Sequence, residues 1–478
     1  MANSIIEQNP RITTLPVGQE IIFVVSNDTA VANETKVKFI AEVHIGTSIP
    51  NPSTNTNLIA TFKTTPNNAG VGIFDFRNIV ENFVSSDNIG GVNSRYKNKV
   101  TSDTFTFPVH LSDKFSLCDN SFRYLVIQFK VEFLGADTSQ PNIVSVASGT
   151  AANSDVYRLF NGYLKRTDVL TSDLNSNNFG FDLQDFEAVA TFPTINTRSF
   201  LTNAPTQLYA NLEDYGTIGI LQTSSTLWDN ARDVKFTYYS SAGANLGNDT
   251  YTKNSTNGAF FGYSADHRKQ IAFIGVYPGN LRNDTTNTFT SLITAGTVQG
   301  GYYTIEIRNA SSLNVYQTYT VNLNCPDEKQ FESIRLCWLN QWGAWDYYTF
   351  TKKSSRTLST QKTTYNQLEG TWNNRVYKMD GFQGGKKTFR VNTTESIRMN
   401  TDYISVNDNT ILEELINSPE VYLLDGFQSD VNYSLLNQYV TPVRLSTSSF
   451  ARKTVANDKL IQYTFEIEKS KTFRTQSV

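Results

Sequence analysis

Short segments rich in β-branched and aromatic residues recur along this chain, and each ends at Asn, Asp, Gly or Pro. Over part of its length each segment alternates apolar with polar residues, which is typical of strands with one buried face. The clearest examples are EIIFVV from Glu20, KVKFIAEVHI from Lys36, NLIATFKT from Asn57 and FRYLVIQFKVEFL from Phe122. They predict a mainly β fold, made of tandem antiparallel β-sandwich or barrel-like domains with a few short helices.

Two segments carry a helical pattern instead. In FDFRNIVENFVSSD the apolar residues fall on one helical face, and Asp75 is placed as an N-cap. A second helix is predicted near 410–417, where Thr410 and Glu413 have the spacing of a capping box and Ser418-Pro419 ends the pattern. The predicted apolar faces are Ile79, Val80, Phe83 and Val84 in the first helix and Ile411, Leu412, Leu415 and Ile416 in the second.

The length of 478 residues is enough for about three domains with separate cores. We expect an N-terminal β-domain with one short helix over 1–197 and a middle β-sandwich domain over 198–326. A C-terminal β-domain over 327–478, with the short helix near 410–417, would follow the charged CPDEKQ linker that begins at Cys325. The polar stretch between Ser240 and Asp266 is expected to be an exposed loop.

Composition and charge bear on the partners. The formal net charge is −3 and 18% of the residues are charged, with both signs interspersed, so we expect neither nucleic acid nor a membrane as a partner. The first twenty residues have no secretory signal pattern, and no apolar run approaches the ~18 residues of a membrane span, so we expect a soluble protein made in the cytosol. Cys118, Cys325 and Cys337 are far apart, which favours reduced core thiols over a metal site or a disulfide framework.

No pattern of catalytic chemistry is present in the sequence. The histidines His44, His110 and His267 lie far apart, and neither a phosphate-binding glycine loop nor a calcium-binding loop is matched. A glycosidase needs only two carboxylates, so acidic residues are the hardest candidates to dismiss; a role in turns or on the solvated surface explains them better. We therefore assign no catalytic residue, no metal ligand and no cofactor. The nominal acidic candidates are Asp182, Asp185, Glu187 and Asp346.

The stretch CWLNQWGAWDYYTF from Cys337 holds a cluster of three tryptophans. SIRLCWL reads as a strand buried on both sides, Gly343 lies in a turn, and YYTF resumes a strand, so the pattern predicts a β-hairpin with an aromatic corner. Packing inside the corner is the favoured interpretation. Sugar stacking and anchoring of a neighbouring subunit stay open, so we expect Trp338 to be buried and take Trp342 and Trp345 as candidate interface residues.

A short echo, Tyr-x-x-Asp-Gly-Phe-Gln, begins at Tyr377 and again at Tyr422. Asp-Gly after an apolar run is a hairpin turn signal. Two similar hairpins therefore explain the echo better than a duplicated binding motif.

Several segments together resemble a family of virion proteins of tailed bacteriophages, particularly phages that infect Bacteroidota. They are IIFVVSNDTA and KVKFIAEVHI near the start, FLTNAP and RLCWLNQWGAWDYYTF in the middle, and ILEELINSPEVYLLDG, TPVRLST and NDKLIQYTFEIEKS near the end. The resemblance implies a component of the particle in the tail, collar or baseplate, or on the head. Its end is also similar to the end of tail ring and adaptor proteins, and the family pattern contains no catalytic residues.

From the resemblance we expect a structural virion protein, not an enzyme, that is located in the virion and assembles with other virion proteins and with copies of itself. A chain rich in strands and exposed polar loops suits a subunit that buries its edges in an assembly. The alternatives are a head-decorating capsid auxiliary protein and a carbohydrate-binding adhesin or glycan-degrading enzyme. An adhesin for a host-surface glycan would present a row of exposed Trp or Tyr rings, and the enzyme would bring two carboxylates together in a deep pocket.

Overall fold

The computed structural model divides the chain into two compact units. Unit 1 comprises Met1–Asn324, Leu339–Asp346 and Ser429–Tyr433, and unit 2 comprises Cys325–Trp338, Tyr347–Gln428 and Ser434–Val478. Both are mainly β, as predicted, and among the described residues none of the sheets closes into a barrel. The structure describes residues 5–10, 12–88, 108–112, 115–118, 120–134, 140–145, 153–165, 187–188, 199–222, 233–252, 271–282, 286–309, 312–314, 316–324, 331–372, 375–379, 381–405, 409–424, 439–449, 451 and 460–475.

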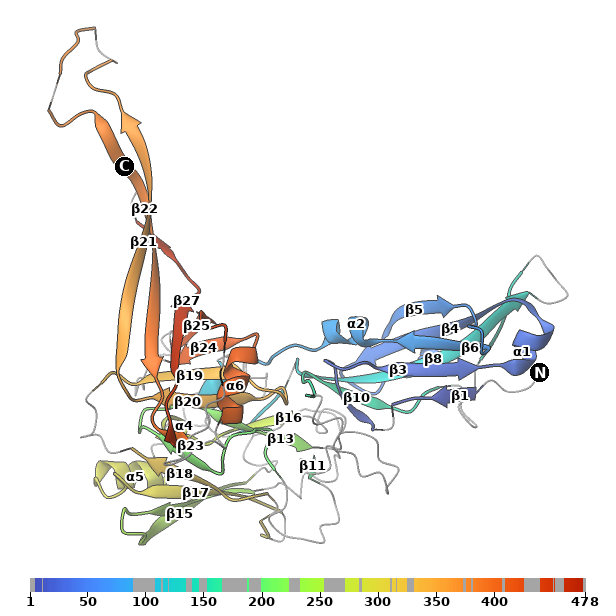
Figure 1. Ribbon diagram of the computed structural model, residues 1–478. Helices are drawn as coiled ribbons and strands as arrows, with labels where there is room; N and C mark the ends of the chain where they lie inside the picture. Colours follow the sequence, from blue (N-terminus) through green and yellow to red (C-terminus); the bar gives the residue numbers. More distant parts are fainter. Residues whose placement is uncertain are drawn as a thin grey trace. The chain divides into compact units, whose positions relative to one another are not determined.

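The N-terminal part of unit 1 is a sandwich of two sheets. One has the order β1-β3-β6 and the other the order β2-β10-β8-β4-β5, with β9 paired to β8 (Figure 1). The inward-facing apolar residues of the two sheets form one core, in which Phe23 and Phe129 lie 5.5 Å apart between ring centroids. The strands are β1 (Ile5–Gln8), β2 (Thr14–Pro16), β3 (Ile22–Ser26), β4 (Thr35–Gly46), β5 (Leu58–Thr64), β6 (Val71–Asp75), β8 (Phe122–Leu134), β9 (Asn142–Ser145) and β10 (Tyr157–Phe160).

The predicted helix after β6 is present but short. Helix α2 (Arg77–Val80) continues into the 3₁₀ turn η2 (Glu81–Phe83), and Val80 and Val84 are buried as expected. The N-cap residue is Phe76 rather than Asp75, although an oxygen of the Asp75 carboxylate accepts a hydrogen bond of 3.0 Å from the backbone N–H of Arg77. The other helical elements of this part are α1 (Asp28–Asn33), η1 (Pro52–Thr54) and η3 (Val109–Leu111).

The rest of unit 1 holds two further sheets, with the orders β11-β13-β16-β7 and β12-β18-β17-β14-β15. The expectation of a loop from Ser240 is wrong for Asn245–Thr252, which forms the edge strand β15 paired with β14. Its polar residues are compatible with a strand because it lies at an edge and none of its described side chains is buried; residues 253–266 lie outside the described residues. The elements are β7 (Phe115–Leu117), β11 (Glu187–Ala188), β12 (Gln207–Ala210), β13 (Thr217–Gln222), β14 (Asp233–Tyr239), β16 (Ile271–Gly275), α4 (Pro278–Arg282), α5 (Thr288–Thr294), β17 (Tyr302–Arg308) and β18 (Tyr319–Leu323).

An eight-stranded sheet contains most strands of unit 2, in the order β20-β19-β24-β25-β27-β22-β21, with β28 paired to β22. The predicted second helix is α6 (Asn409–Asn417), which buries Ile411, Leu412 and Leu415. Thr410 lies inside α6 rather than at its N-cap, because the helix begins one residue earlier. The strands are β19 (Ile334–Leu339), β20 (Trp345–Phe350), β21 (Ser354–Gln367), β22 (Gly385–Asn400), β23 (Ile404–Ser405), β24 (Val421–Leu424), β25 (Val440–Leu445), β26 (Leu460–Ile461), β27 (Thr464–Lys469) and β28 (Phe473–Arg474).

The predicted division into 1–197, 198–326 and 327–478 stays a prediction beside these two observed units. Strand β7, from the first predicted domain, pairs with β16, from the second, through Ala272 and Leu117. Within the described part of the chain, no helix combines the length and the apolar character that crossing a membrane requires.

Candidate functional site

The tryptophan corner is a β-hairpin, as predicted, formed by β19, a turn at 340–344, and β20. The side-chain oxygen of Asn340 accepts hydrogen bonds of 3.0 Å from the backbone N–H groups of Trp342 and Ala344, which closes the turn. Gly343 has φ +74°, and a Cβ on it would lie 2.4 Å from the carbonyl oxygen of Asn161, so both conformation and space require glycine.

All three tryptophans are buried, with exposed fractions of 0% for Trp338, 5% for Trp342 and 2% for Trp345. The indole N–H of Trp342 donates to the side-chain oxygen of Asn203 at 3.3 Å, and that of Trp345 donates to the carbonyl of Asp87 at 3.0 Å. All four residues belong to unit 1. The interface prediction for Trp342 and Trp345 is therefore corrected, because segments of the same chain cover both indoles.

Those of the other sequence candidates that the structure describes do not form one site. Asp346 is buried and accepts a hydrogen bond from the Thr202 hydroxyl. His44 is buried in β4, where its Nδ1 lies 3.1 Å from the carbonyl oxygen of Thr56, and His110 packs edge-on against Trp345. Of the described residues, no group of three or more His, Cys, Asp or Glu could hold a metal ion. Asp182, Asp185 and His267 lie outside the described residues, as does the side chain of Glu187.

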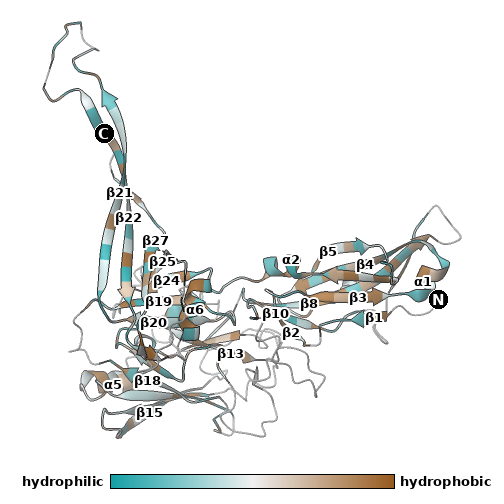
Figure 2. Cartoon of the chain, viewed as in Figure 1, coloured by the Kyte–Doolittle hydropathy of each residue, from teal (hydrophilic) through white to brown (hydrophobic). Residues whose placement is uncertain are grey.

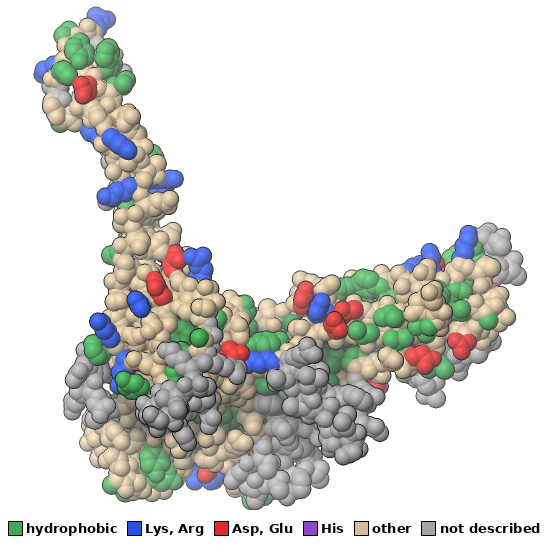
Figure 3. Space-filling model, viewed as in Figure 1, with side chains coloured by type: hydrophobic (Ala, Val, Ile, Leu, Met, Phe, Trp, Pro, Cys, Tyr) green, Lys and Arg blue, Asp and Glu red, His purple; other side chains and the backbone are tan. Residues whose placement is uncertain are grey.

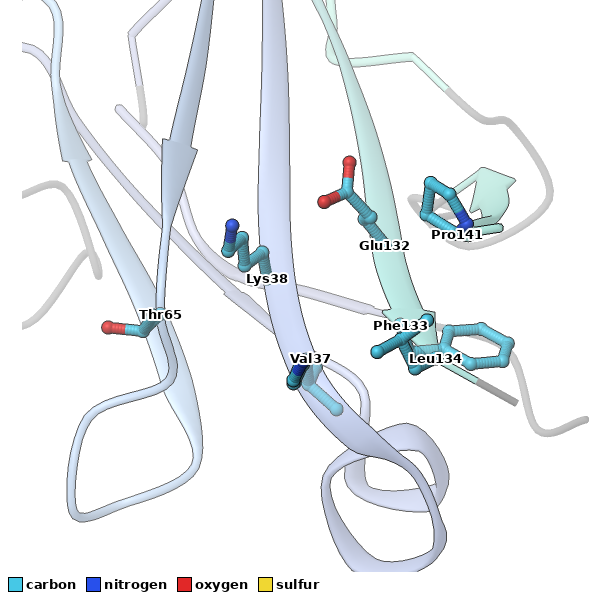
Figure 4. A pocket seen from close by; sticks show the side chains of 8 residues that line it. Val37, Lys38, Thr65, Glu132, Phe133, Leu134 and Pro141 are labelled. Carbon is cyan, nitrogen blue, oxygen red and sulfur yellow. The ribbon is translucent and has the colours of Figure 1, made fainter. Parts of the chain in front are cut away.

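A cavity of about 400 Å³ lies where β4 begins and β5 and β8 end in the N-terminal sandwich (Figure 4). Glu132 is the only carboxylate among the residues that line it, and it is paired with Lys63. A second cavity of about 580 Å³, beside the end of α6 in unit 2, is lined by no Asp or Glu among the described residues. Neither cavity offers the carboxylate pair that a glycosidase requires. The first is lined by Lys36, Val37, Lys38, Thr65, Glu132, Phe133, Leu134 and Pro141.

The most prominent feature of unit 2 is a long β-hairpin, residues 354–400, which we call the arm. Strands β21 and β22 pair from Ser354–Met399 to Gln367–Gly385 and run together away from β27, β25 and β24 (Figure 1). At about 3.3 Å per residue, the 16 residues of β22 span about 50 Å. Only the base of β22 has a second neighbour among the described strands, because β27 pairs with Ser396–Asn400 and β28 with Asn392 and Thr393.

The outer part of the arm is a two-stranded ribbon with water on both faces. Strand β21 is exposed at nearly every position, and Figure 2 colours most of the ribbon teal or white. Cross-strand pairs such as Thr364 with Thr388 give it β-propensity without an apolar face. A two-stranded hairpin in water is marginally stable by itself, so such a ribbon is typical of an element that is stabilised by something it binds.

The end of the arm carries an exposed apolar cluster. We call the described residues of 368–384 the tip, and Figure 3 shows hydrophobic side chains gathered there beside an acidic one, with Lys and Arg along the arm. An exposed apolar group of this kind marks an interaction site, since water solvates it poorly. The cluster consists of Leu368, Trp372, Val376, Tyr377, Met379 and Phe382, which are 55% to 75% exposed.

The described residues of the tip hold a defined local structure. The backbone N–H of Thr371 donates to the carbonyl of Lys378 at 3.1 Å, and the N–H of Lys378 donates to the Thr371 hydroxyl at 2.9 Å. The rings of Trp372 and Tyr377 lie 5.3 Å apart, and the Trp372 indole N–H donates to the carbonyl of Glu369 at 2.5 Å. Gly370, with φ +87°, lies under the Tyr377 ring, where a Cβ would come within 2.3 Å. The apolar cluster is thus presented on an organised loop.

An ion-pair network holds the base of the arm. The Arg356 guanidinium donates to both Glu332 and Glu395, and the Lys469 ammonium lies 2.8 Å from Glu395. The hydrogen bond from Arg356 lowers the pKa of Glu332, and the hydrogen bond from Lys469, helped by Arg356, lowers the pKa of Glu395. These residues come from β21, β22, β27 and the segment before β19, so the network ties the arm to its sheet.

The arm is basic in an acidic chain. Residues 354–400 contain eight Lys or Arg and three Asp or Glu, a net charge of +5, whereas the whole chain has −3. The rest of the chain therefore carries −8. A positive appendage on a negative body favours association through electrostatic steering.

The sequence pattern alone missed the arm. Strand β21 consists mainly of Ser, Thr, Lys and Gln, and the hydrophobic periodicity that identifies strands is absent from it because neither of its faces is buried. The available signals were the threonines on both strands and the Tyr377 echo, whose residues 377–379 and 381–383 lie in the tip. Asp380 lies outside the described residues, so the turn that its Asp-Gly predicts stays a prediction. The second echo continues from β24 into residues outside the described ones.

No family model matches the chain, and no curated protein matches it.

Proposed function

We propose that this protein is a structural component of a tailed bacteriophage virion, of the tail, collar or baseplate ring or adaptor type, and that it acts by protein–protein assembly. The arm is its assembly element. Other virion proteins and copies of the chain itself are the partners of this proposal, and the virion is its location.

The observation that carries the proposal is the arm, whose tip is 55% to 75% exposed at six large apolar side chains. An enzyme or a monomeric binding protein has no use for a hairpin whose longer strand spans about 50 Å, whose outer part buries neither face and which ends in exposed Trp, Tyr and Phe. An assembly subunit does, because the ribbon reaches a neighbour and the aromatic side chains are buried there. The resemblance of the sequence to phage virion proteins is the reason for proposing a phage particle as the assembly.

A head-decorating position is the alternative within the same class. The second candidate function, an adhesin for a host-surface glycan, is favoured by one observation: Trp372 and Tyr377 are exposed side by side on the tip. Their rings are inclined by 53°, whereas stacking on one flat sugar face is best served by coplanar rings. Assembly is therefore the better supported function.

The test is electron microscopy of particles labelled with an antibody against the purified chain. Labelling at the tail, collar or baseplate supports the proposal, and labelling over the head replaces it with the decorating alternative. A protein that is absent from particles and strictly monomeric, and that cleaves or binds glycans, contradicts it. Glycan binding is measured with the wild type and with Trp372→Ser, since the adhesin function requires that indole.

A further inference from the structure

We propose that the tip of one copy docks on the outer face of the β1-β3-β6 sheet of a second copy. This inference rests on the proposed assembly function and names the partner of the arm. We call the outer face of that sheet, defined by Ile5, Ile22, Val24, Ile73 and Asp75, the acceptor face.

The acceptor face is apolar although it faces solvent. Phe23, Val25 and Phe74 point into the sandwich core, so their strand neighbours point outward. Val24 and Ile73 are register partners and lie side by side on this face. Ile5, Ile22 and Ile73 are 39% to 53% exposed. A sheet face that carries isoleucines into water is suited to burial by a partner.

The acceptor face is also acidic. Glu7 and Asp75 are the charged residues of its three strands, and Glu20 and Asp28 flank β3 in the sequence. All four are exposed. No Lys, Arg or His occurs within these strands, and the nearest described cation in the sequence is Arg77 in α2.

The tip has the complementary character. Residues 368–387 hold four cations, Arg375, Lys378, Lys386 and Lys387, against the two acids Glu369 and Asp380, a net charge of +2, so the apolar cluster lies in a segment whose net charge is opposite to that of the acceptor face. Apolar contact at the centre and opposite charges at the rim is the usual anatomy of a specific interface. A membrane surface would also accept an apolar, basic tip, but it leaves the acceptor face unexplained.

A contact between tip and acceptor face is heterologous, because the two surfaces differ. Each copy that uses its tip on a neighbour keeps its own acceptor face free for another neighbour, so the contact propagates into a ring or a chain. This is the kind of contact that a ring component needs.

The first experiment uses two variants of the full chain and their mixture. Trp372→Ser with Phe382→Ser removes the centre of the tip, and Ile22→Lys with Ile73→Lys places positive charge on the acceptor face. All four positions are exposed, and circular dichroism and thermal unfolding verify that the variants fold. The matched control is Tyr209→Ser with Tyr403→Ser, at exposed aromatics outside both surfaces.

Light scattering coupled to size exclusion gives the mass of each sample. We expect wild type and control to form oligomers, and each surface variant to self-associate more weakly by about tenfold or more per aromatic or isoleucine changed. The equimolar mixture should give a one-to-one dimer, because one intact tip then meets one intact acceptor face. A monomeric wild type at high concentration, a face variant that assembles like wild type, or a mixture without dimer overturns the inference.

The second experiment separates a second copy from the other occupants. A photo-crosslinking amino acid replaces Phe382, and light and isotope-labelled chains are mixed before irradiation. Crosslinks that join light to heavy peptides from β1, β3 or β6 support the inference. Crosslinks within one chain only, crosslinks to a different surface, or sedimentation of the chain with phosphatidylglycerol vesicles in place of crosslinking each overturn it.

The two proposals fail separately. Crosslinking within purified particles that joins Phe382 to another virion protein leaves the proposed function intact and refutes the second-copy partner. If the tip docks on the acceptor face of a second copy but the protein is absent from particles, the second-copy partner is supported and the proposed virion function is refuted.

Discussion

The indole N–H of Trp345 donates a 3.0 Å hydrogen bond to the backbone carbonyl of Asp87, which lies 258 positions earlier in the chain. Both residues are buried, and the Asp87 carboxylate in turn accepts hydrogen bonds from the N–H groups of Asn120 and Ser121 at 2.8 and 3.1 Å. Trp345 thus connects the second half of the sequence to a fixed loop of the first.

Replacing Trp345 by Phe removes this donor and leaves a small void. We expect the free energy of unfolding to fall by about 2–4 kcal/mol, from the lost hydrogen bond and the lost packing together. Chemical denaturation followed by fluorescence measures the change. Trp372→Phe is the matched control, because that indole is 66% exposed and its loss should change stability by less than about 0.5 kcal/mol. Equal effects at the two positions would contradict the assigned burial.

Gly343→Ala should destabilise unit 1 by more than the cost of placing alanine in the left-handed backbone conformation. The conformation costs about 1 kcal/mol for alanine, and the added Cβ would also lie 2.4 Å from the Asn161 carbonyl oxygen. Gly296→Ala is the control, since Gly296 has φ +68° and no heavy atom within 4 Å of the added Cβ. Thermal unfolding of both variants separates the conformational cost from the clash, and the prediction is lost if Gly343→Ala unfolds no earlier than Gly296→Ala.

Sequence patterns predicted the elements that bury one face and missed those that bury none. Strands β4 and β8 carry β-branched and aromatic residues whose alternation indicates which side chains face the core. Helix α6 carries four apolar residues at helical spacing. Strand β21 of the arm has no such alternation, because it is exposed at nearly every position. The burial of Trp342 and Trp345 could not be predicted from their own segment. Their indole N–H groups donate hydrogen bonds to Asn203 and Asp87, and both acceptors are remote in sequence.

Acid should loosen the base of the arm. The pKa values of Glu332 and Glu395 are lowered in the folded state, so their ion pairs stabilise unit 2 above the unfolded pKa of about 4.3 and lose that contribution as pH falls through the lower folded values. The carboxylates are partly exposed, so each pair contributes about 0.2–1 kcal/mol. We expect stability that is flat from pH 7 to 5 and falls below pH 4.5, as measured by thermal unfolding across pH.

Arg356→Met should reduce this acid dependence, because Arg356 holds both carboxylates. Arg444→Met is its control: Arg444 pairs with Glu468 on the same sheet but is 74% exposed, so solvent screens the pair more strongly. An unchanged acid dependence in Arg356→Met would contradict the stabilisation of the base of the arm by this network.

Cys337 should be unreactive in the folded protein. Burial raises the pKa of its thiol well above the usual range, so almost no thiolate is present near pH 8, and Cys118 is buried as well. Pulse labelling with iodoacetamide and mass spectrometry should find Cys337 alkylated only in denaturant. Labelling at the same rate with and without urea would contradict its position in the core of β19.

The hairpin that carries Trp345 also determines when unit 1 can finish folding during synthesis. Leu339–Asp346 belongs to unit 1, although the rest of unit 1 that the structure describes ends at Asn324. A nascent chain that has emerged only as far as Asn324 lacks the indoles of Trp342 and Trp345, so unit 1 cannot finish its core while the ribosome is still synthesising the start of unit 2. A fragment that ends between the two units in the sequence would lack the same two indoles. Expressing unit 1 by itself would therefore fail unless residues 339–346 are included with it.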